Sequence, residues 1–407
     1  MKRALISIAC FMVASLAMAQ TLVLQRGNVN VLYDVQQMGE VLVAEDATSL
    51  SIAGTTFDIS SIDQMLITNQ EVKPLTVDVV YAEKGATVNL SGDVAPYLTV
   101  DVADGDVSII ADALLQQEVT YCLSGASSSA SFTMDGEFKA TVVLNEVSLT
   151  STTLNMPAVN ILNGKRINIE VNGENSFADV AGGSHKGAFF VNGHAEFTGA
   201  GTLQIKGNSK HAYVSDEYTQ IKAAFTGSIN VIGAVNDAFH IDQYLLMQGG
   251  KLTMKNVGGD GIDVSITNDA SDEWNGQVFV EGGEIELDVA ADDTKGIKCD
   301  ADMTISGGTI KGSVSGDGTK GLSIDGNLLI NEATNATLID LVVTGTTYAP
   351  GTVDESKCRG IKGKGDFTFD GGRILISATG VKSKAISIDG NYYYRSGSLN
   401  CAVDAAN

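Results

Sequence analysis

The sequence is poor in proline and aromatic residues and carries no excess of positive charge. Four prolines beside 45 glycines, without a Gly-X-Y period, exclude a collagen and a proline-rich disordered chain. The formal net charge of −23 is spread along the whole chain, which argues against nucleic acid or an anionic membrane as a partner. The composition therefore indicates a β protein with glycine turns, whose ligands are cations, neutral molecules or molecules bridged by a cation.

Long apolar runs are confined to the first residues. Residues 1–19 begin with Lys2 and Arg3, continue with an apolar stretch and end in Ala17-Met18-Ala19, which predicts a secretory signal peptide cleaved after this motif. A lipoprotein signal at Cys10 would cut the apolar stretch short. No later segment approaches the roughly 20 apolar residues that span a bilayer. We therefore expect a secreted or cell-surface protein without an integral membrane segment.

Cysteine pairs with metal-site or redox spacing are also missing. The chain has no CxxC motif and no Cys/His spacing typical of zinc. Cys299 falls in an apolar row of the repeat described below, which favours a buried thiol over a disulfide. Cys358 follows two turns later, about 10 Å away by stacking and beyond disulfide reach. Pairing stays open among the four cysteines that follow the signal peptide: Cys122, Cys299, Cys358 and Cys401.

What the chain does have is an internal repeat. Residues 293–300 match residues 318–325 after a shift of 25. A step from a small to a bulky apolar residue recurs at Ala188-Phe189, Ala212-Tyr213, Ala238-Phe239, Gly261-Ile262, Gly296-Ile297, Gly321-Leu322, Gly360-Ile361 and Ala385-Ile386. Such self-similarity is typical of a solenoid, and short alternating runs make the unit β. Three runs per unit predict an all-β, three-sided parallel β-helix (β-solenoid) with about 25 residues per turn.

The repeat also predicts which side chains face inwards. Parallel stacking puts equivalent residues about 4.8 Å apart on successive turns, so aligned positions form rows along the tube. The first apolar row is expected inside: Phe189, Tyr213, Phe239, Ile262, Ile297, Leu322, Ile361 and Ile386. The next residue of each turn is expected outside: Phe190, Val214, His240, Asp263, Lys298, Ser323, Lys362 and Ser387. Any function on this face must use the outside row.

Composition and spacing divide the chain into four segments. We expect a signal peptide at 1–19, a small β-rich module at 20–72, a β-strand linker or solenoid cap at 73–117 and the β-helix at 118–400. Two turns carry insertions, one with the only tryptophan, Trp274, and one with Tyr348. Insertions that leave the apolar rows unbroken must loop out of the tube, and such loops commonly carry binding residues.

Acidic residues gather in neighbouring turns of the repeat. Like charges about 4.8 Å apart repel by about 1 kcal/mol even at the dielectric constant of water, so such a group needs a counterion. Calcium takes about six to eight oxygen ligands with loose geometry and is the cation that we expect here. The predicted ligands are Asp237, Asp260, Asp263, Asp292 and Asp293, with Asp317 next in line. The alternative is that aspartate and asparagine only fill the tight turns of the solenoid.

Basic and aromatic residues suggest contacts with a ligand. Lys295, Lys320 and Arg359 occupy one position of successive turns, where they can bind a ligand's carboxylates or pair with nearby aspartates. Trp274, on its inserted loop, can stack on a sugar ring or only pin the loop to the tube. The histidines are scattered and indicate neither a metal triad nor a Ser-His relay: His185, His194, His211 and His240.

The sharpest catalytic hypothesis is a polyuronate lyase. Calcium would lower the pKa of the proton α to a uronate carboxyl, and Lys295 or Lys298 would abstract that proton. Lysines beside a calcium site are too common to identify an enzyme by themselves. Glycoside hydrolysis needs two carboxylates roughly 5–9.5 Å apart. Because the chain has so many aspartates, pairs at this distance arise by accident and do not identify a glycoside hydrolase.

Several segments together resemble one family. EVTYCLSG, GEFKATVVLNEVSL, NDAFHIDQYLLMQGGKLTM, GDGIDVS and DDTKGIKCDADMTISGGTI are similar to segments of the carbohydrate-binding-domain proteins, which are secreted bacterial right-handed parallel β-helices. The likeness covers residues 118–400. It implies polysaccharide binding, an architecture shared with polysaccharide lyases, and calcium between turns with four of the aspartates as ligands: Asp237, Asp260, Asp292 and Asp293. No catalytic residue transfers.

The leading hypothesis is therefore a secreted, non-catalytic protein that binds an extended polysaccharide along one face of the β-helix, with calcium dependence left open. A calcium-dependent polyuronate lyase is the second hypothesis. A structural or adhesive surface solenoid is the third.

Overall fold

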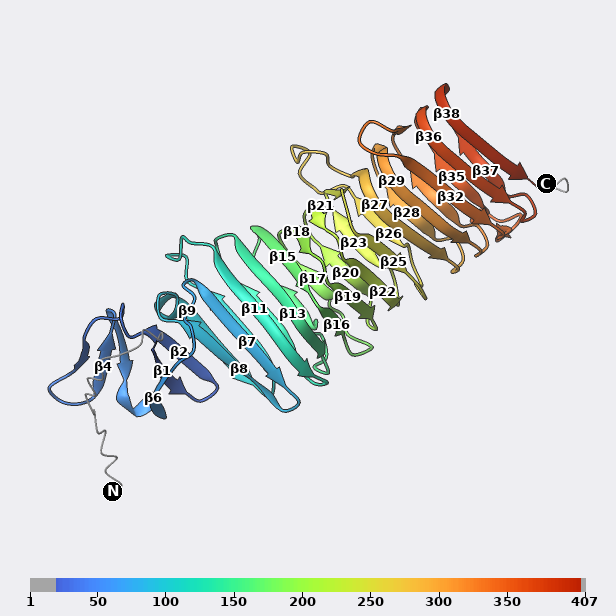
Figure 1. Ribbon diagram of the computed structural model, residues 1–407. Coiled ribbons are helices and arrows are strands. Elements are labelled where there is room, and N and C mark those ends of the chain that lie inside the picture. Colours follow the sequence, from blue (N-terminus) through green and yellow to red (C-terminus); the bar gives the residue numbers. More distant parts are fainter. Residues whose placement is uncertain (1–19, 404–407) are drawn as a thin grey trace.

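The protein is a long tube of stacked β turns with a small module at its N-terminal end (Figure 1). The computed structural model describes residues 20–403, and the predicted signal peptide at residues 1–19 lies outside them. The tube has about 11 turns of about 26 residues. The all-β solenoid predicted from the repeat is thus confirmed. Within residues 20–403, no helix is long and apolar enough to cross a membrane.

The N-terminal module consists of antiparallel strands around a core of its own. β1 pairs with β2 and β6, and β3, β4 and β5 form a second small sheet. Leu24, Ile52 and Phe57 are among its buried residues. Parallel pairing of β2 with β8 connects the module to the tube. The elements are β1 (Thr21–Arg26), β2 (Val29–Asp34), β3 (Val41–Val43), β4 (Ser49–Ile52), β5 (Thr55–Asp58), η1 (Ile59–Ser61) and β6 (Gln64–Thr68).

Two hairpins open the tube. The first joins β7 (Thr76–Ala82) to β8 (Gly85–Ser91), and the second, after η2 (Ala95–Tyr97), joins β9 (Leu98–Ala103) to β10 (Asp106–Ala111). From each hairpin one strand continues into the parallel stack, because β7 pairs with β11 and β10 pairs with β12. Parallel stacking of the solenoid turns begins at these two pairings.

The tube has three faces. The first face consists of β12 (Phe132–Asp135), β14 (Val159–Ile161), β17 (Gly187–Val191), β20 (His211–Ser215), β23 (Phe239–Asp242), β26 (Ile262–Ser265), β28 (Lys295–Cys299), β30 (Lys320–Ile324), β35 (Arg359–Gly363) and β37 (Lys384–Ile388). The second face consists of β11 (Val119–Ser127), β13 (Ala140–Thr150), β15 (Arg166–Asn172), β18 (His194–Gly199), β21 (Thr219–Phe225), β24 (Tyr244–Met247), β27 (Gln277–Val289), β29 (Met303–Val314), β31 (Leu328–Asn331), β36 (Phe367–Ala378) and β38 (Tyr392–Val403).

The third face combines short strands with the far ends of long ones. Its short strands are β16 (Glu174–Ala178), β19 (Thr202–Gly207), β22 (Ser228–Ala234), β25 (Lys251–Met254) and β32 (Thr337–Val343). The long strands β13, β27, β29, β36 and β38 bend from the second face into the third. In β27 the bend falls at Gly282 and Gly283, where the register shifts.

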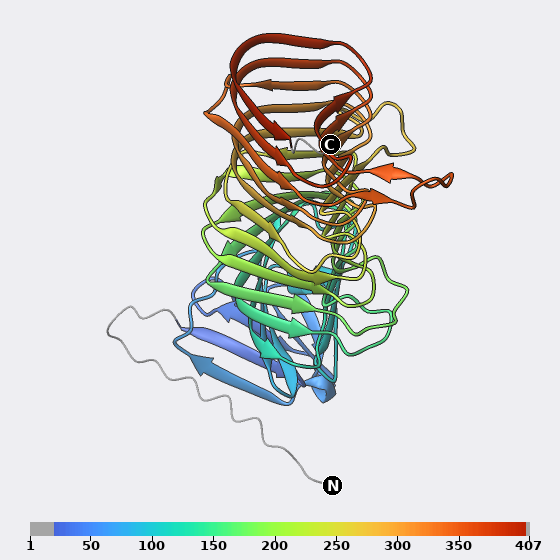
Figure 2. The same ribbon diagram turned by 90° about the vertical axis from the view of Figure 1, so that its right-hand side faces the viewer.

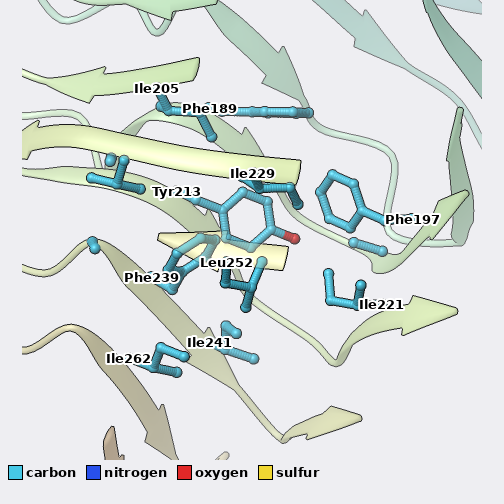
Figure 3. Close-up of a cluster of buried hydrophobic side chains, with 14 of the residues drawn as sticks. Phe189, Phe197, Ile205, Tyr213, Ile221, Ile229, Phe239, Ile241, Leu252 and Ile262 are labelled. Carbon is cyan, nitrogen blue, oxygen red and sulfur yellow. The ribbon is translucent and has the colours of Figure 1, made fainter. Parts of the chain in front are cut away.

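Apolar side chains from all three faces fill the tube. Phe189 is paired in register with Tyr213, and this row continues unbroken to Ile386, which confirms the predicted inside row. Phe189 lies edge to face on Tyr213 with ring centroids 5.7 Å apart, and Phe197 packs against both (Figure 3). Successive turns are therefore joined by side-chain packing as well as by backbone hydrogen bonds.

The outside row departs from the expectation at its start. Phe190 and Val214 are only 8% and 1% exposed. Lys186, in the loop before β17, lies over Phe190, with its Nζ 5.3 Å from the centre of the ring. From His240 onward the outside row is partly exposed or charged, as predicted.

All four described cysteines are free thiols, and Cys299 is buried as predicted.

The two insertions lie outside the regular strands of the tube. The insertion with Tyr348 forms a small ribbon of β33 (Thr347–Tyr348) and β34 (Ser356–Lys357), which projects sideways from the tube (Figure 2). The insertion with Trp274 follows β26 and leads into β27.

Candidate functional site

A row of aromatic rings runs across four turns of the second face. His194, Tyr218 and Tyr244 each stand directly before the first inward residue of a strand, so the pleat sends them outwards. His194 stacks on Tyr218 with ring centroids 4.4 Å apart, and Tyr218 stacks on Tyr244 at 4.8 Å. The Tyr218 hydroxyl donates to Glu196, and Gln220 donates to the Tyr244 hydroxyl. We call His194, Tyr218, Tyr244, Trp274 and Phe279 the aromatic row.

Trp274 closes the aromatic row from its inserted loop. Its indole stands edge-on to Tyr244, with centroids 5.1 Å apart, and contacts Phe279 at 5.0 Å. These contacts pin the loop to the tube, which is one of the two alternatives drawn from the sequence. Trp274 is still 40% exposed, so stacking on a sugar ring stays a prediction. Its backbone φ of 55° lies in the left-handed region that bulky residues rarely adopt. The stacked rings cover one another's faces, whereas the indole lies across the end of the stack.

Further along the second face, the position of the aromatic row is occupied by aspartate and asparagine. The Asn327 N–H donates to Asp302 Oδ1 (2.7 Å), the Asp366 N–H to Asn327 Oδ1 (2.9 Å) and the Asn391 N–H to Asp366 Oδ1 (2.8 Å). This Asp/Asn ladder borders a shallow hollow that is also lined by Thr304, Leu329, Thr368, Tyr393 and Arg395. The second face therefore offers an aromatic patch followed by hydrogen-bonding groups.

A second group of candidate site residues lies at the start of the first-face strands. The His211 and His240 rings stack with centroids 4.6 Å apart. Asp237 Oδ2 lies 3.0 Å from His211 Nδ1 and 3.4 Å from His240 Nδ1. Among the described residues, these three are the one group whose ligand atoms all come within 4.8 Å of one another. We call His211, Asp237 and His240 the His–Asp cluster.

Charge and burial in the His–Asp cluster shift several pKa values. Contacts with the Asp237 and Asp263 carboxylates raise the pKa of His240 to about 9. Burial would raise the pKa of Asp237, but the two imidazoles outweigh burial and hold it below its usual range. Burial lowers the pKa of His211. Burial raises the pKa of Asp260, one turn further along, to about 6. The cluster is therefore a charged group of side chains that is largely withdrawn from water.

The five predicted calcium ligands occupy different environments. Asp237 and Asp263 both contact His240, and Asp263 also pairs with Lys298. Asp260 Oδ1 accepts the Lys295 N–H, and Asp292 Oδ1 accepts the Asp317 N–H, each at 2.8 Å. Asp293 lies 3.5 Å from Lys320, and Asp317 in turn accepts the Thr346 N–H.

These contacts bear on the fit to calcium. Calcium prefers about six to eight oxygen ligands. Two imidazoles and one carboxylate converge at the cluster instead, and the contacted oxygens of Asp260 and Asp292 are engaged with the backbone of the next turn. The donor set at Asp237 is therefore mixed nitrogen and oxygen, and calcium binding by the five aspartates stays a prediction.

The basic residues that were predicted to contact a ligand donate hydrogen bonds to backbone carbonyl oxygens. Lys295 Nζ donates to the Asp293 carbonyl and Lys320 Nζ to the Gly318 carbonyl, both at 2.7 Å. Arg359 is buried and donates to the carbonyl oxygens of Cys358 and Lys382. These residues begin first-face strands, whereas Trp274 follows the end of one, so the structure does not bring the two sets together.

Sequence reasoning missed both groups. It treated the histidines as scattered, which was wrong for His211 and His240. The repeat contained the signal, since alignment puts His211 against Asp237 and His240 beside Asp263 in the outside row. The aromatic row was missed because only the first-face strands were aligned, and His194, Tyr218 and Tyr244 share one position of the second face.

Comparison with known proteins bears on the fold and the family. A family model described as carbohydrate-binding domain-containing protein matches residues 104–404. No curated protein matches the chain. A solved structure of a polysaccharide lyase-like protein from C. thermocellum, a gadolinium derivative, is similar with a TM-score of 0.51 and 21% identity, over 65% of this chain and 99% of that one. At this identity the likeness concerns the fold alone.

Proposed function

Because this chain belongs to the carbohydrate-binding domain-containing protein family, we propose that it is a secreted, non-catalytic protein that binds an extended polysaccharide along the second face. The family was predicted from the sequence and supports a function that involves polysaccharides. Export rests on the signal-peptide pattern of residues 1–19.

The observation that carries this proposal is the position of Trp274. Flat, rigid aromatic rings bind sugars well, because they bury apolar area with little loss of conformational entropy. The Trp274 indole is half-exposed yet fixed by Tyr244 and Phe279, so little additional entropy is lost when a sugar binds. Beyond it, the Asp/Asn ladder and the adjoining hollow offer hydrogen-bond partners for further sugar units.

The state of the candidate lysines favours binding over catalysis. Lys298 Nζ lies 2.8 Å from Asp263 and 3.1 Å from Asp300. Partial burial would lower the pKa of Lys298, but these two carboxylates outweigh burial and raise it. A lysine that holds its proton so firmly is a poor base for the abstraction step of a lyase. Lys295 Nζ donates a hydrogen bond to the Asp293 carbonyl oxygen.

Calcium dependence and the two alternative functions are tested with the same protein. Calcium dependence stays a prediction, and glycan binding measured with calcium and with a chelator examines it. A polyuronate lyase would release unsaturated products that absorb in the ultraviolet, whereas a structural or adhesive solenoid would bind no soluble glycan. A panel of neutral and uronate polysaccharides separates these cases.

Replacement of the indole tests the proposal directly. We expect Trp274→Ala to weaken binding of the recognised polysaccharide by at least about tenfold, since truncation of an aromatic hot spot costs about 2 kcal/mol or more. Tyr348→Ala is the matched control, because Tyr348 is equally exposed (38%) on the other inserted loop. Calorimetric titration measures both variants. Equal affinity of Trp274→Ala and the parent protein would place the binding face elsewhere on the tube.

A further inference from the structure

We propose that His211, Asp237 and His240 bind one divalent transition-metal ion of the zinc class. Imidazole nitrogens and a carboxylate oxygen are ligands that such ions prefer, whereas calcium prefers oxygen alone. The three residues come from two successive turns: His211 begins β20, Asp237 is aligned with it one turn later, and His240 lies in β23. This site is separate from the proposed glycan face, because it lies at the start of first-face strands.

The spacing of the ligand atoms fits a small metal ion. In a tetrahedral site with bonds of about 2.0–2.1 Å, neighbouring ligand atoms are about 3.3–3.4 Å apart. Asp237 Oδ2 lies 3.0 Å from His211 Nδ1 and 3.4 Å from His240 Nδ1. All three ligand atoms come within 4.8 Å of one another, so only the two imidazole nitrogens need to approach. Three protein ligands leave one position of a tetrahedron for water.

The remaining polar atoms of the cluster hold its ligands in place. Asp237 Oδ1 accepts the Asp260 N–H at 2.8 Å, which turns Oδ2 towards the imidazoles. His240 Nε2 faces the Asp242 carboxylate at 3.9 Å, a distance that would have to shorten before Asp242 could accept its N–H. Asp263 adds a second carboxylate 3.2 Å from His240 Nδ1, and Lys298 fixes the other oxygen of Asp263.

Without an ion, the polar contacts of the two imidazole nitrogens are ion-pair contacts with carboxylates and one long hydrogen bond. His240 Nδ1 is buried, and no partner among the described residues meets it with hydrogen-bond geometry. His211 Nδ1 receives the Asp237 N–H only at a long 3.3 Å, although the ring is almost fully buried. A cation between the two nitrogens and Asp237 Oδ2 would contact all three atoms at once. It would replace the proton of His240 Nδ1, which is released to solvent, and the Asp237 N–H at His211 Nδ1.

Zinc titration of the chelator-treated full chain tests the site. We expect one equivalent of Zn²⁺ to bind with a rise in melting temperature, unaffected by millimolar Ca²⁺. His240→Ala and Asp237→Asn should each weaken zinc binding by more than about 10- to 100-fold, which is what loss of an outer partner alone costs. Asp237→Asn keeps an oxygen acceptor for the Asp260 N–H, so its fold should survive. His194→Ala, a histidine of the second face, is the matched control and should bind zinc as the parent does.

Three results would overturn the proposal. The first is an absence of saturable zinc binding by the parent chain. The second is zinc binding that His240→Ala and Asp237→Asn leave unchanged, which would move the ion to another site. The third is displacement of zinc by an equal concentration of calcium, which would show an oxygen-only site. Co²⁺ absorption bands typical of tetrahedral coordination, lost in His240→Ala, would provide independent support.

Discussion

Aspartate residues have two different roles in this chain. At Asp302, Asp317 and Asp366, a side-chain oxygen accepts the backbone N–H of the next turn and so replaces a missing backbone partner at the corner of the tube. At Asp237 one oxygen does this, while the other faces two imidazoles. The same residue type is thus a turn element in most turns and part of a candidate site in one.

The turn role predicts that amide can replace carboxylate in the ladder. Asn327 already occupies the same position between Asp302 and Asp366 and accepts the same kind of N–H. We expect Asp366→Asn to change the free energy of unfolding by less than about 0.5 kcal/mol, and Asp366→Ala to cost about 1 kcal/mol for the lost hydrogen bond to Asn391. Chemical denaturation measures both. Equal losses for the two variants, appearing only when calcium is present, would instead mark Asp366 as a ligand for a cation.

Residue chemistry also shows where sequence reasoning stopped. Rows such as Phe189 to Ile386 were predictable, because a period of two within strands and a fixed repeat between turns determine which side is inside. The His–Asp cluster was not predicted, because His211 and His240 occupy different positions of their turns. His211 is aligned with Asp237, and His240 follows Asp237 by three residues, so alignment of equivalent positions does not pair the two histidines. Formal charge alone suggested an all-oxygen cation site there, whereas the geometry adds two nitrogens.

At the scale of elements, glycine determines how a strand passes from one face to the next. The long strands β27 and β29 bend at Gly282-Gly283 and Gly307-Gly308. At Gly283 the backbone has φ of 78°, and an added Cβ would come within 2.6 Å of the Gly249 carbonyl oxygen. The glycine pairs of the repeat therefore lie at bends. A side chain there would be disfavoured by the left-handed backbone conformation and by contact with the next turn.

Two alanine substitutions separate conformation from crowding. Gly351 has the same φ of 78°, but an added Cβ would meet nothing within 4 Å. We expect Gly351→Ala to cost about 1–2 kcal/mol for the left-handed backbone alone, and Gly283→Ala to cost distinctly more because the next turn must move. Thermal unfolding of both variants checks the order. Equal melting temperatures would mean that the turns have room to spread.

The elements also explain which loops were predictable. Both insertions were expected to leave the tube, because the apolar rows continue without a gap on either side. What the Trp274 loop does could not be decided from sequence, since its contacts are with Tyr244 and Phe279, which lie on different strands. Only the register of the second face brings these rings together.

At the scale of the whole molecule, the second face runs along the length of the tube (Figure 1). Parallel stacking repeats the same outward position every 4.8 Å or so, and this position changes from aromatic residues to aspartate and asparagine between β24 and β29. A face of this kind suits a ligand that repeats along its own length. The three-sided architecture was predictable from the repeat, whereas the choice of the functional face required the rings to be placed in space.

The central claim is that an extended glycan lies along the second face, with Trp274 at one contact and the hollow beside Asp366 at others. The most direct measurement is the calorimetric affinity of the chain from residue 20 onward for a series of oligosaccharides of increasing length from the recognised polysaccharide. The account predicts that affinity rises with each added unit until the face is filled and then stays constant, and that Trp274→Ala lowers the affinity of the whole series. A monosaccharide that binds as tightly as the polymer, or an affinity that does not depend on length, would contradict it.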